Sequence, residues 1–270
     1  MSGPPALDQV LAPGGLTAVF QPVFEIGGDV PRLHYLEGLI RGPAGTNLED
    51  ASTLFEYVRR KREEAAVDRA CVAAILKAAA PLPGEPDLSL NVHAITLARD
   101  PDFPAALSFT ADACGIRPSR LIVEIVEHAP PWATSRMEAV LQLLRRLHVR
   151  IALDDVGLGN SNYKMMLDVH PHYFKLDRHL VHGCHADPYR RAVIESVVQL
   201  ASKVKARVIA EGVEVLAEVD ALGDMGVDLA QGWFFSPALT AWAVMARGYF
   251  STAAPAPGLQ AGGLTRLRGE

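Results

Sequence analysis

Short runs of β-branched and apolar residues alternate with longer amphipathic stretches along most of the chain. The runs predict eight strands, at residues 18–26, 34–41, 88–93, 120–126, 149–155, 173–177, 207–212 and 228–233. The stretches between them predict helices over about 51–79, 102–114, 134–147, 189–204 and 214–225. Alternation of this kind is typical of a largely parallel sheet. Eight strands in one domain of this size favour a closed α/β barrel over an open sheet.

The predicted strands are apolar until their last third and then present a polar side chain. These polar residues are Glu37, Asn91, Glu124, Asp154 with Asp155, Lys175, Glu211 and Gln231. In a parallel barrel the carboxyl ends of the strands meet at one rim, so we expect these side chains to converge. They interrupt apolar runs such as VEIV and VIAEGV, which indicates burial rather than ordinary solvated strand ends. Buried carboxylates must take up protons or bind a cation.

The predicted rim offers oxygen ligands and no convincing set of His or Cys residues. Such ligands suit Mg²⁺ or Mn²⁺, and also Ca²⁺, better than zinc. The adjacent Asp154 and Asp155 fit a two-metal site, in which two divalent ions stabilise the attacking and leaving oxygens at phosphorus. Lys175 and Arg41 add cations for phosphate oxygens. The pattern favours metal-assisted phosphoester chemistry, and a metal-dependent reaction of the enolase or aldolase type fits nearly as well.

Composition restricts the class of protein and its partners. The 270 residues are 49% hydrophobic and 21% charged, as in an ordinary globular protein, and a net charge of −5 argues against indiscriminate binding to nucleic-acid polymers or anionic membranes. No apolar run is long enough to span a membrane, and the N-terminus lacks the pattern of a secretory signal. Three cysteines are too few for a disulfide framework, so we expect a reducing, cytoplasmic setting. We expect a flexible N-terminus over 1–15, one barrel domain over 16–250 and a disordered Ala/Pro/Gly tail over 251–270.

Eight short motifs, taken in order, resemble those of one family. They are FQPVF (20–24), EGLIR (37–41), LNVH (90–93), VEIVE (123–127), DDVGLGNSN (154–162), KLD (175–177), EGVE (211–214) and QGWFFSP (231–237). Over about residues 16–237 the chain resembles the EAL-domain family of cyclic di-GMP phosphodiesterases and receptors. The resemblance implies a modified (β/α)8 TIM-like barrel whose first strand runs antiparallel. It also implies hydrolysis of cyclic di-GMP to the linear dinucleotide pGpG, and a homodimer.

The resemblance assigns a role to each matching residue. It implies a first metal bound by Glu37, Asn91, Glu124 and Asp154, and a second metal bound by Asp154 as the bridge and by Asp155. Lys175 and Glu211 match the pair that positions and activates the water, and which of them is the base stays open. Substrate binding is implied for Gln21, Arg41 and Gln231, and support of the loop after the paired aspartates for Glu127. The implied cofactor is Mg²⁺ or Mn²⁺, with Ca²⁺ expected to inhibit.

Two departures from the family pattern keep a second function open. The motif that gives the family its name reads Glu37-Gly38-Leu39 here. The loop over residues 156–162 reads VGLGNSN where active members typically carry Phe-Gly-Thr-Gly-Tyr-Ser-Ser, so Leu158 replaces a threonine and Asn160 a tyrosine. The alternative is therefore a catalytically weak or silent cyclic di-GMP receptor that signals through a protein partner. An interaction module that binds no nucleotide is a third reading.

Overall fold

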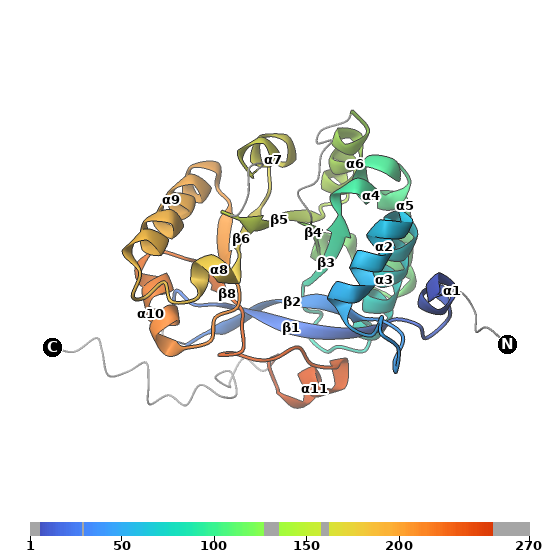
Figure 1. Ribbon diagram of the computed structural model, residues 1–270, viewed down its shortest axis with the longest axis horizontal. Helices are drawn as coiled ribbons and strands as arrows, with labels where there is room; N and C mark the ends of the chain where they lie inside the picture. The colour runs from blue at the N-terminus through green and yellow to red at the C-terminus, as the bar shows by residue number, and fades with distance from the viewer. Residues whose placement is uncertain (1–5, 29, 127–134, 158–161, 251–270) are drawn as a thin grey trace.

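Eight strands pair in chain order and close into a barrel (Figure 1). The computed structural model describes residues 6–28, 30–126, 135–157 and 162–250. The strands are β1 (Thr17–Glu25), β2 (Arg32–Arg41), β3 (Leu88–His93), β4 (Leu121–Val126), β5 (Arg150–Val156), β6 (Tyr173–Leu176), β7 (Arg207–Ala210) and β8 (Leu229–Ala230). β1 runs antiparallel to both β2 and β8, and the other neighbours are parallel. The predicted barrel and its antiparallel first strand are confirmed.

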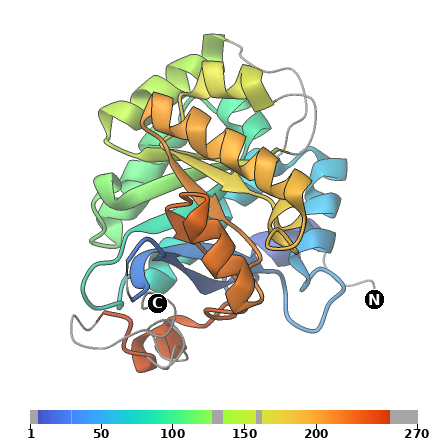
Figure 2. The ribbon, with the colours of Figure 1, turned by 90° about the vertical axis from the view of Figure 1, so that its left-hand side faces the viewer.

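Helices cover the outside of the barrel. They are α1 (Ala6–Leu11), α2 (Ala51–Lys61), α3 (Glu64–Ala79), α4 (Ala94–Arg99), α5 (Phe103–Ala113), α6 (Ser135–Arg146), α7 (Asn162–Val169), α8 (Arg178–Val181), α9 (Pro188–Val204), α10 (Leu216–Asp224) and α11 (Ala241–Ala246). The short 3₁₀ helix η1 (Pro118–Arg120) leads into β4. α3 packs against β1, β2 and β3, and α9 packs across β6 and β7 (Figure 2). No helix of the described ranges has the length and apolar character needed to cross a bilayer.

The structure contains short helices that the sequence did not predict, α1, α4, α7, α8 and α11, and it divides one predicted helix in two. The single helix expected over 51–79 is two helices, because Arg62 adopts a left-handed backbone (φ 60°) and ends α2. Helix α1 lies within the segment expected to be flexible, and its Val10 is buried. The expected tail over 251–270 lies outside the described residues.

The barrel interior is filled in two layers. The lower layer is an inner apolar cluster with one residue from every strand but β3: Val23, Tyr35, Ile122, Ala152, Tyr173, Ile209 and Leu229. Ser89 of β3 stands at the same level. Because side chains alternate along a strand, the next inward positions lie two residues away, and all are polar. They are Gln21, Glu37, Asn91, Glu124, Asp154, Lys175, Glu211 and Gln231. This period of two explains why β2 to β8 read as apolar and then polar, whereas in the antiparallel β1 the polar Gln21 precedes Val23.

Candidate active site

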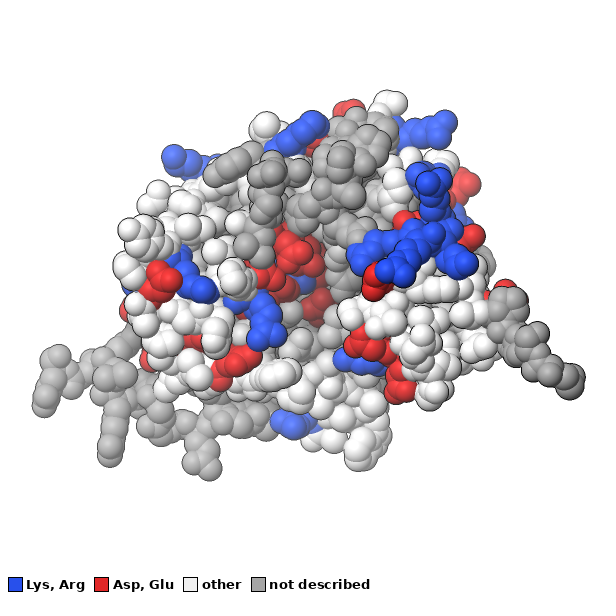
Figure 3. Space-filling model, in the orientation of Figure 1, with Lys and Arg blue, Asp and Glu red and all other residues white. Residues whose placement is uncertain are grey.

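Lys175 lies at the centre of the polar layer and is almost fully buried. Its Nζ is 2.5 Å from Glu124 Oε2 and 2.6 Å from Glu211 Oε1. It also lies 3.5 Å from Glu37 Oε1 and 3.6 Å from Asp154 Oδ1. Figure 3 shows acidic side chains at the bottom of the hollow in the middle of this face. Four carboxylates thus share one ammonium group, which leaves an excess of negative charge.

Two amide side chains orient the carboxylate of Glu37. Asn91 Nδ2 donates to Glu37 Oε1 at 3.0 Å. Gln231 Nε2 donates to Glu37 Oε2 at 2.7 Å and to Glu211 Oε1 at 3.2 Å. The buried Gln231 Oε1 has no hydrogen-bond partner within the described part of the chain. An oxygen acceptor left in this way beside excess carboxylate suits a cationic ligand.

The same surroundings push the pKa values of the buried carboxyls apart. Burial opposes the charge of Glu37, but Lys175 and the amides of Asn91 and Gln231 outweigh it, and its pKa is lowered. Burial and the neighbouring charge of Glu37 raise the pKa of Glu124 to about 7. Burial likewise raises the pKa of Glu211 well above its ordinary value, although Lys175 opposes the shift. The site therefore holds carboxyls that differ strongly in their readiness to give up a proton.

Lys175 itself is held in the charged form. Burial favours the neutral amine, but the charges of Asp154, Glu124 and Glu211 raise its pKa well above the ordinary value. A lysine in this state donates hydrogen bonds and does not accept a proton. Around neutral pH it serves as a fixed cation.

The paired aspartates stand at an irregularity in β5. The pairing of β5 with β6 shifts between Leu153 and Val156, and Asp155 has a positive φ of 52°. The backbone N–H of Asp155 donates to Asp154 Oδ1 at 3.0 Å. The shift lets Asp154 face Lys175 while Asp155 lines a separate cavity of about 290 Å³. A left-handed conformation costs an Asp residue energy, and such strain is often found at functional sites.

The cavity that Asp155 lines adjoins the polar layer through Asn91. Arg41, Arg59, Phe55 and His93 also line it. Arg59 belongs to a basic last turn of α2, and basic side chains gather there at the rim (Figure 3). Arg59 was not among the predicted site residues, because a run of charges on a helix is typical of a solvated face.

Asp68 of α3 forms hydrogen bonds with both the ring and the backbone of His93. Its ring Nδ1 lies 2.8 Å from Asp68 Oδ1, and its backbone N–H donates to Asp68 Oδ2 at 2.9 Å. Thr96 Oγ1 donates to the same Oδ2 at 2.6 Å. These bonds tie α3 to the carboxyl end of β3, next to Asn91.

The remaining predicted site residues lie at the margin or outside the described residues. Gln21 pairs with Glu37 in the β1–β2 register, and its Nε2 donates to Ser236 O at 3.0 Å. Arg41 Nη1 donates to Ile40 O at 3.0 Å. Glu127, together with Leu158 and Asn160 of the altered loop, lies outside the described residues.

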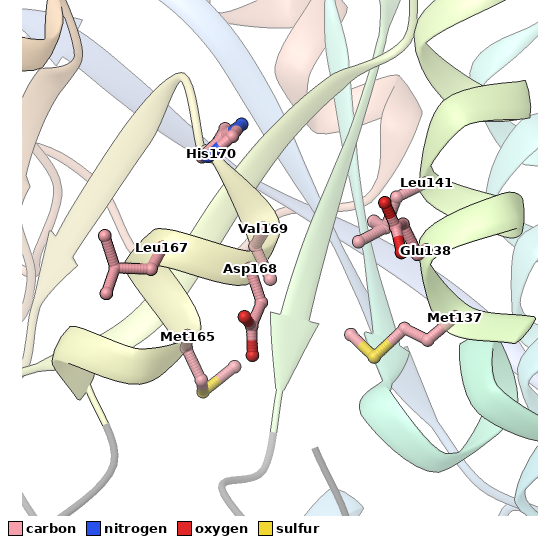
Figure 4. A pocket seen from close by; sticks show the side chains of 8 residues that line it. All are labelled: Met137, Glu138, Leu141, Met165, Leu167, Asp168, Val169 and His170. Atoms are coloured by element: carbon pink, nitrogen blue, oxygen red, sulfur yellow. The ribbon is translucent and has the colours of Figure 1, made fainter. Parts of the chain in front are cut away.

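A different cavity lies between α6 and α7, away from the polar layer. Its volume is about 200 Å³, and Met137 of α6 and Met165 of α7 reach into it from opposite sides (Figure 4). Its lining combines five apolar residues with Glu138, Asp168 and His170, and it includes none of the eight polar residues of the barrel interior. This cavity does not offer the chemistry of the barrel mouth.

The donor set of the barrel mouth suits a hard divalent cation. Carboxylate and amide oxygens are the ligands that Mg²⁺ and Mn²⁺ prefer. Within the described ranges, no group of three or more His, Cys, Asp or Glu side chains is already arranged around one point as metal ligands. Four carboxylates, those of Glu37, Glu124, Asp154 and Glu211, instead surround Lys175 Nζ. A divalent cation would compete with that ammonium for the same oxygens.

Comparison with known proteins identifies relatives of the chain. A family model described as EAL domain matches residues 6–238. The cyclic di-GMP phosphodiesterase TpdA of Vibrio parahaemolyticus is 30% identical over 115 residues, which cover 43% of this chain and 20% of that protein. The probable cyclic di-GMP phosphodiesterase PdeG of Escherichia coli is 32% identical over 124 residues, 46% of this chain and 24% of that protein. The aligned part is therefore a quarter or less of each relative's length.

Solved structures give the same relationship over more of the chain. BlrP1 of Klebsiella pneumoniae, in complex with calcium and cyclic di-GMP, has a TM-score of 0.76 and 27% identity, and covers 89% of this chain and 59% of its own. Its complex with manganese and cyclic di-GMP at pH 9.0 has a TM-score of 0.76 and 28% identity, with 85% and 58% covered.

Proposed function

The chain belongs to the EAL-domain family, and we propose that it hydrolyses one phosphodiester bond of cyclic di-GMP to give linear pGpG. The observation that carries the proposal is the layer of carboxylate and amide side chains at the barrel mouth, with a single lysine against four carboxylates. Relatives named as cyclic di-GMP phosphodiesterases support it, as do structural neighbours solved with cyclic di-GMP.

We assign the metal ligands by their place in this layer and by the family motifs. Glu37, Asn91, Glu124 and Asp154 would hold one Mg²⁺ or Mn²⁺, and Asp154 and Asp155 a second. When bound, these ions supply positive charge that stabilises the attacking and leaving oxygens at phosphorus. Complexes of a neighbour with calcium and with manganese support the use of divalent cations. We expect Ca²⁺ to bind and to inhibit.

The protein's own groups would position the water and the phosphate. Lys175 Nζ and Glu211 Oε1 lie 2.6 Å apart. A water molecule beside them would therefore have both a hydrogen-bond donor and a hydrogen-bond acceptor within reach. Because Lys175 is kept protonated, Glu211 is the better candidate for the proton acceptor. In the reaction a bond forms between the water oxygen and phosphorus, the bond from phosphorus to ribose O3′ breaks, and O3′ takes a proton. Arg41 would bind a phosphate oxygen from the adjoining cavity.

We also propose the location, the oligomeric state and a partner of the protein. We propose a cytoplasmic protein that acts as a homodimer, in line with its free Cys71, Cys114 and Cys184 and its family. We also propose a regulatory protein partner, because these relatives are several times longer than the part that aligns with this chain.

A catalytically silent receptor for cyclic di-GMP is the second candidate. One observation favours it: the loop over 156–162, directly after the paired aspartates, departs from the sequence that active members carry. Such a receptor would bind the nucleotide tightly and release no product.

A turnover assay separates the two candidates. Purified protein is incubated with cyclic di-GMP in Mn²⁺ or Mg²⁺, and pGpG is measured by chromatography. We expect product from the wild type and loss of activity in Glu37→Ala and Asp154→Asn. Asp168→Asn, an acid-to-amide change on α7, is the matched control and keeps activity. A wild type as inert as Glu37→Ala contradicts the enzyme, and calorimetric binding in Ca²⁺ without turnover then supports the receptor.

A further inference from the structure

A tyrosine from the inner apolar cluster reaches up to the polar layer. Tyr35 is fully buried on β2, two residues before Glu37. Its hydroxyl donates to Glu124 Oε1 at 3.1 Å. β2 and β4 are not neighbours, so this bond crosses the interior past β3. On β3, the residue that pairs with Ile122 of the inner cluster is the small Ser89.

Tyr35 and Lys175 hold the two oxygens of Glu124 separately. Lys175 Nζ contacts Oε2 at 2.5 Å, and the Tyr35 hydroxyl contacts Oε1. Glu124 has no exposed surface. Because Lys175 Nζ also contacts the other three carboxylates, Oε2 is the oxygen on their side, and the Tyr35 bond to Oε1 holds that orientation.

We propose that Tyr35 is a positioning residue that presents Glu124 Oε2 to a divalent cation in the barrel mouth. The inference rests on the proposed metal site. Partners that orient a ligand from behind affect metal affinity strongly, because they fix the ligand's direction before the ion arrives. A buried tyrosine hydroxyl needs a partner, so the bond also fixes Tyr35 itself.

Tyr173 of β6 offers a matched control. It belongs to the same inner cluster, and its ring centroid lies 6.0 Å from that of Tyr35. Its hydroxyl lies 3.1 Å from His34 Nε2 and accepts from Arg150 Nη1 at 3.1 Å. Tyr173→Phe therefore removes a hydroxyl from the same inner cluster whose hydrogen bonds go to His34 and Arg150 rather than to the carboxylates around Lys175.

The test is the affinity of the metal-stripped protein for Mn²⁺, measured from the electron paramagnetic resonance signal of free Mn²⁺. We expect Tyr35→Phe to weaken Mn²⁺ binding by about tenfold or more. Tyr173→Phe should bind Mn²⁺ as the wild type does. In turnover assays, Tyr35→Phe should lower kcat at saturating nucleotide and leave KM for cyclic di-GMP unchanged, because no substrate contact is removed.

The outcomes separate this inference from the proposed function. Wild-type Mn²⁺ affinity in Tyr35→Phe, or equal losses in both Phe variants, overturns the positioning role while the phosphodiesterase stands. Loss of Mn²⁺ binding in Tyr35→Phe alone supports it, even when the wild type yields no pGpG and the phosphodiesterase fails. Circular dichroism checks folding. Should Tyr35→Phe not fold, Tyr35→Met also lacks the hydroxyl and can adapt to the space, and the same Mn²⁺ measurement applies.

Discussion

Glu37 and Glu124 show how residues of one type differ once they are buried side by side. Glu37 accepts hydrogen bonds from two amides and has a lowered pKa. Glu124 has Tyr35 and Lys175 as donors, but deeper burial and the Glu37 charge raise its pKa to about 7. A raised carboxyl pKa means that the folded state binds the proton more tightly than the unfolded state does. Stability is therefore lost as the pH rises through the folded pKa.

We predict that Glu124→Gln becomes more stable relative to wild type as the pH rises from about 4.5 to above 7. The glutamine mimics the neutral acid, so the variant avoids the cost of a buried charge. The difference in unfolding free energy should reach about 3 kcal/mol. Urea unfolding in chelator from pH 4.5 to 8 measures it. Glu37→Gln is the control, because the pKa of Glu37 is lowered. Its stability difference from the wild type should change with pH in the opposite direction, and only below pH 4.5, the ordinary pKa of Glu. A Glu124→Gln difference that does not vary with pH would contradict the prediction.

Gly38 is explained by the helix behind it. A Cβ on Gly38 would lie 2.5 Å from Ile75 Cγ2 of α3 and 3.1 Å from Ser89 O. Ile75 is buried, and its branched side chain must rotate to make room. The glycine in this motif is therefore matched to a large residue on α3.

We predict that Gly38→Ala, although it recreates the common family motif, destabilises this protein by about 1–3 kcal/mol through overpacking. The same change in an Ile75→Ala background should cost less, because that side chain lacks both the Cγ2 atom at 2.5 Å and the Cδ1 atom at 3.0 Å. Thermal unfolding of the four proteins of this cycle gives the coupling. Additive effects of the two substitutions would rule out the clash as the cause.

At the scale of elements, the junction of α2 and α3 shows what periodicity misses. Residues 51–79 read as one helix, but Arg62 has φ 60° and its N–H donates to Arg59 O and Val58 O. The left-handed backbone conformation costs an arginine residue free energy, because its Cβ crowds the following carbonyl oxygen. Nothing in hydrophobic spacing reports such a backbone change.

We predict that Arg62→Gly raises the free energy of unfolding by about 0.5–1 kcal/mol, because glycine relieves the left-handed strain and loses part of the gain to its freer unfolded state. Arg62 is exposed, so no packing is lost. Arg62→Ala retains the Cβ and should show no gain. Denaturant unfolding compares the two, and equal stabilities would mean that the strain is negligible.

Strands were more predictable than helices because their side chains alternate in and out of the barrel. The predicted 88–93 strand coincides with β3, whereas the 228–233 strand shortens to Leu229–Ala230 in β8. Helices α4, α7 and α8 have six, eight and four residues, too few turns for a helical period to register. The polar ends of the strands were visible in sequence, but the central place of Lys175 and the reach of Tyr35 depend on side-chain length across the interior. An aromatic residue in a strand reads simply as core.

At the scale of the whole molecule, the barrel closes around an electrostatic imbalance. The antiparallel β1 completes the ring, and every strand turns one polar side chain into the same mouth. Four carboxylates converge on Lys175 there, and basic residues stand at the rim on α2. The inner apolar cluster stabilises the closed barrel, whereas the carboxylates at the strand ends repel one another. A divalent cation bound at the barrel mouth would relieve that repulsion in the folded state only.

We therefore predict that Mn²⁺ stabilises the fold. At a free concentration 100 times its Kd, a ligand specific for the folded state adds about 2.7 kcal/mol. For a domain of this size that corresponds to a rise in Tm of about 5–10 °C. Calorimetry with and without Mn²⁺ measures the shift, which Glu37→Gln should reduce and Asp168→Asn, on α7, should preserve. An equal shift in Glu37→Gln would place the bound ion elsewhere on the protein. No shift in the wild type would mean that Lys175 alone balances the barrel mouth.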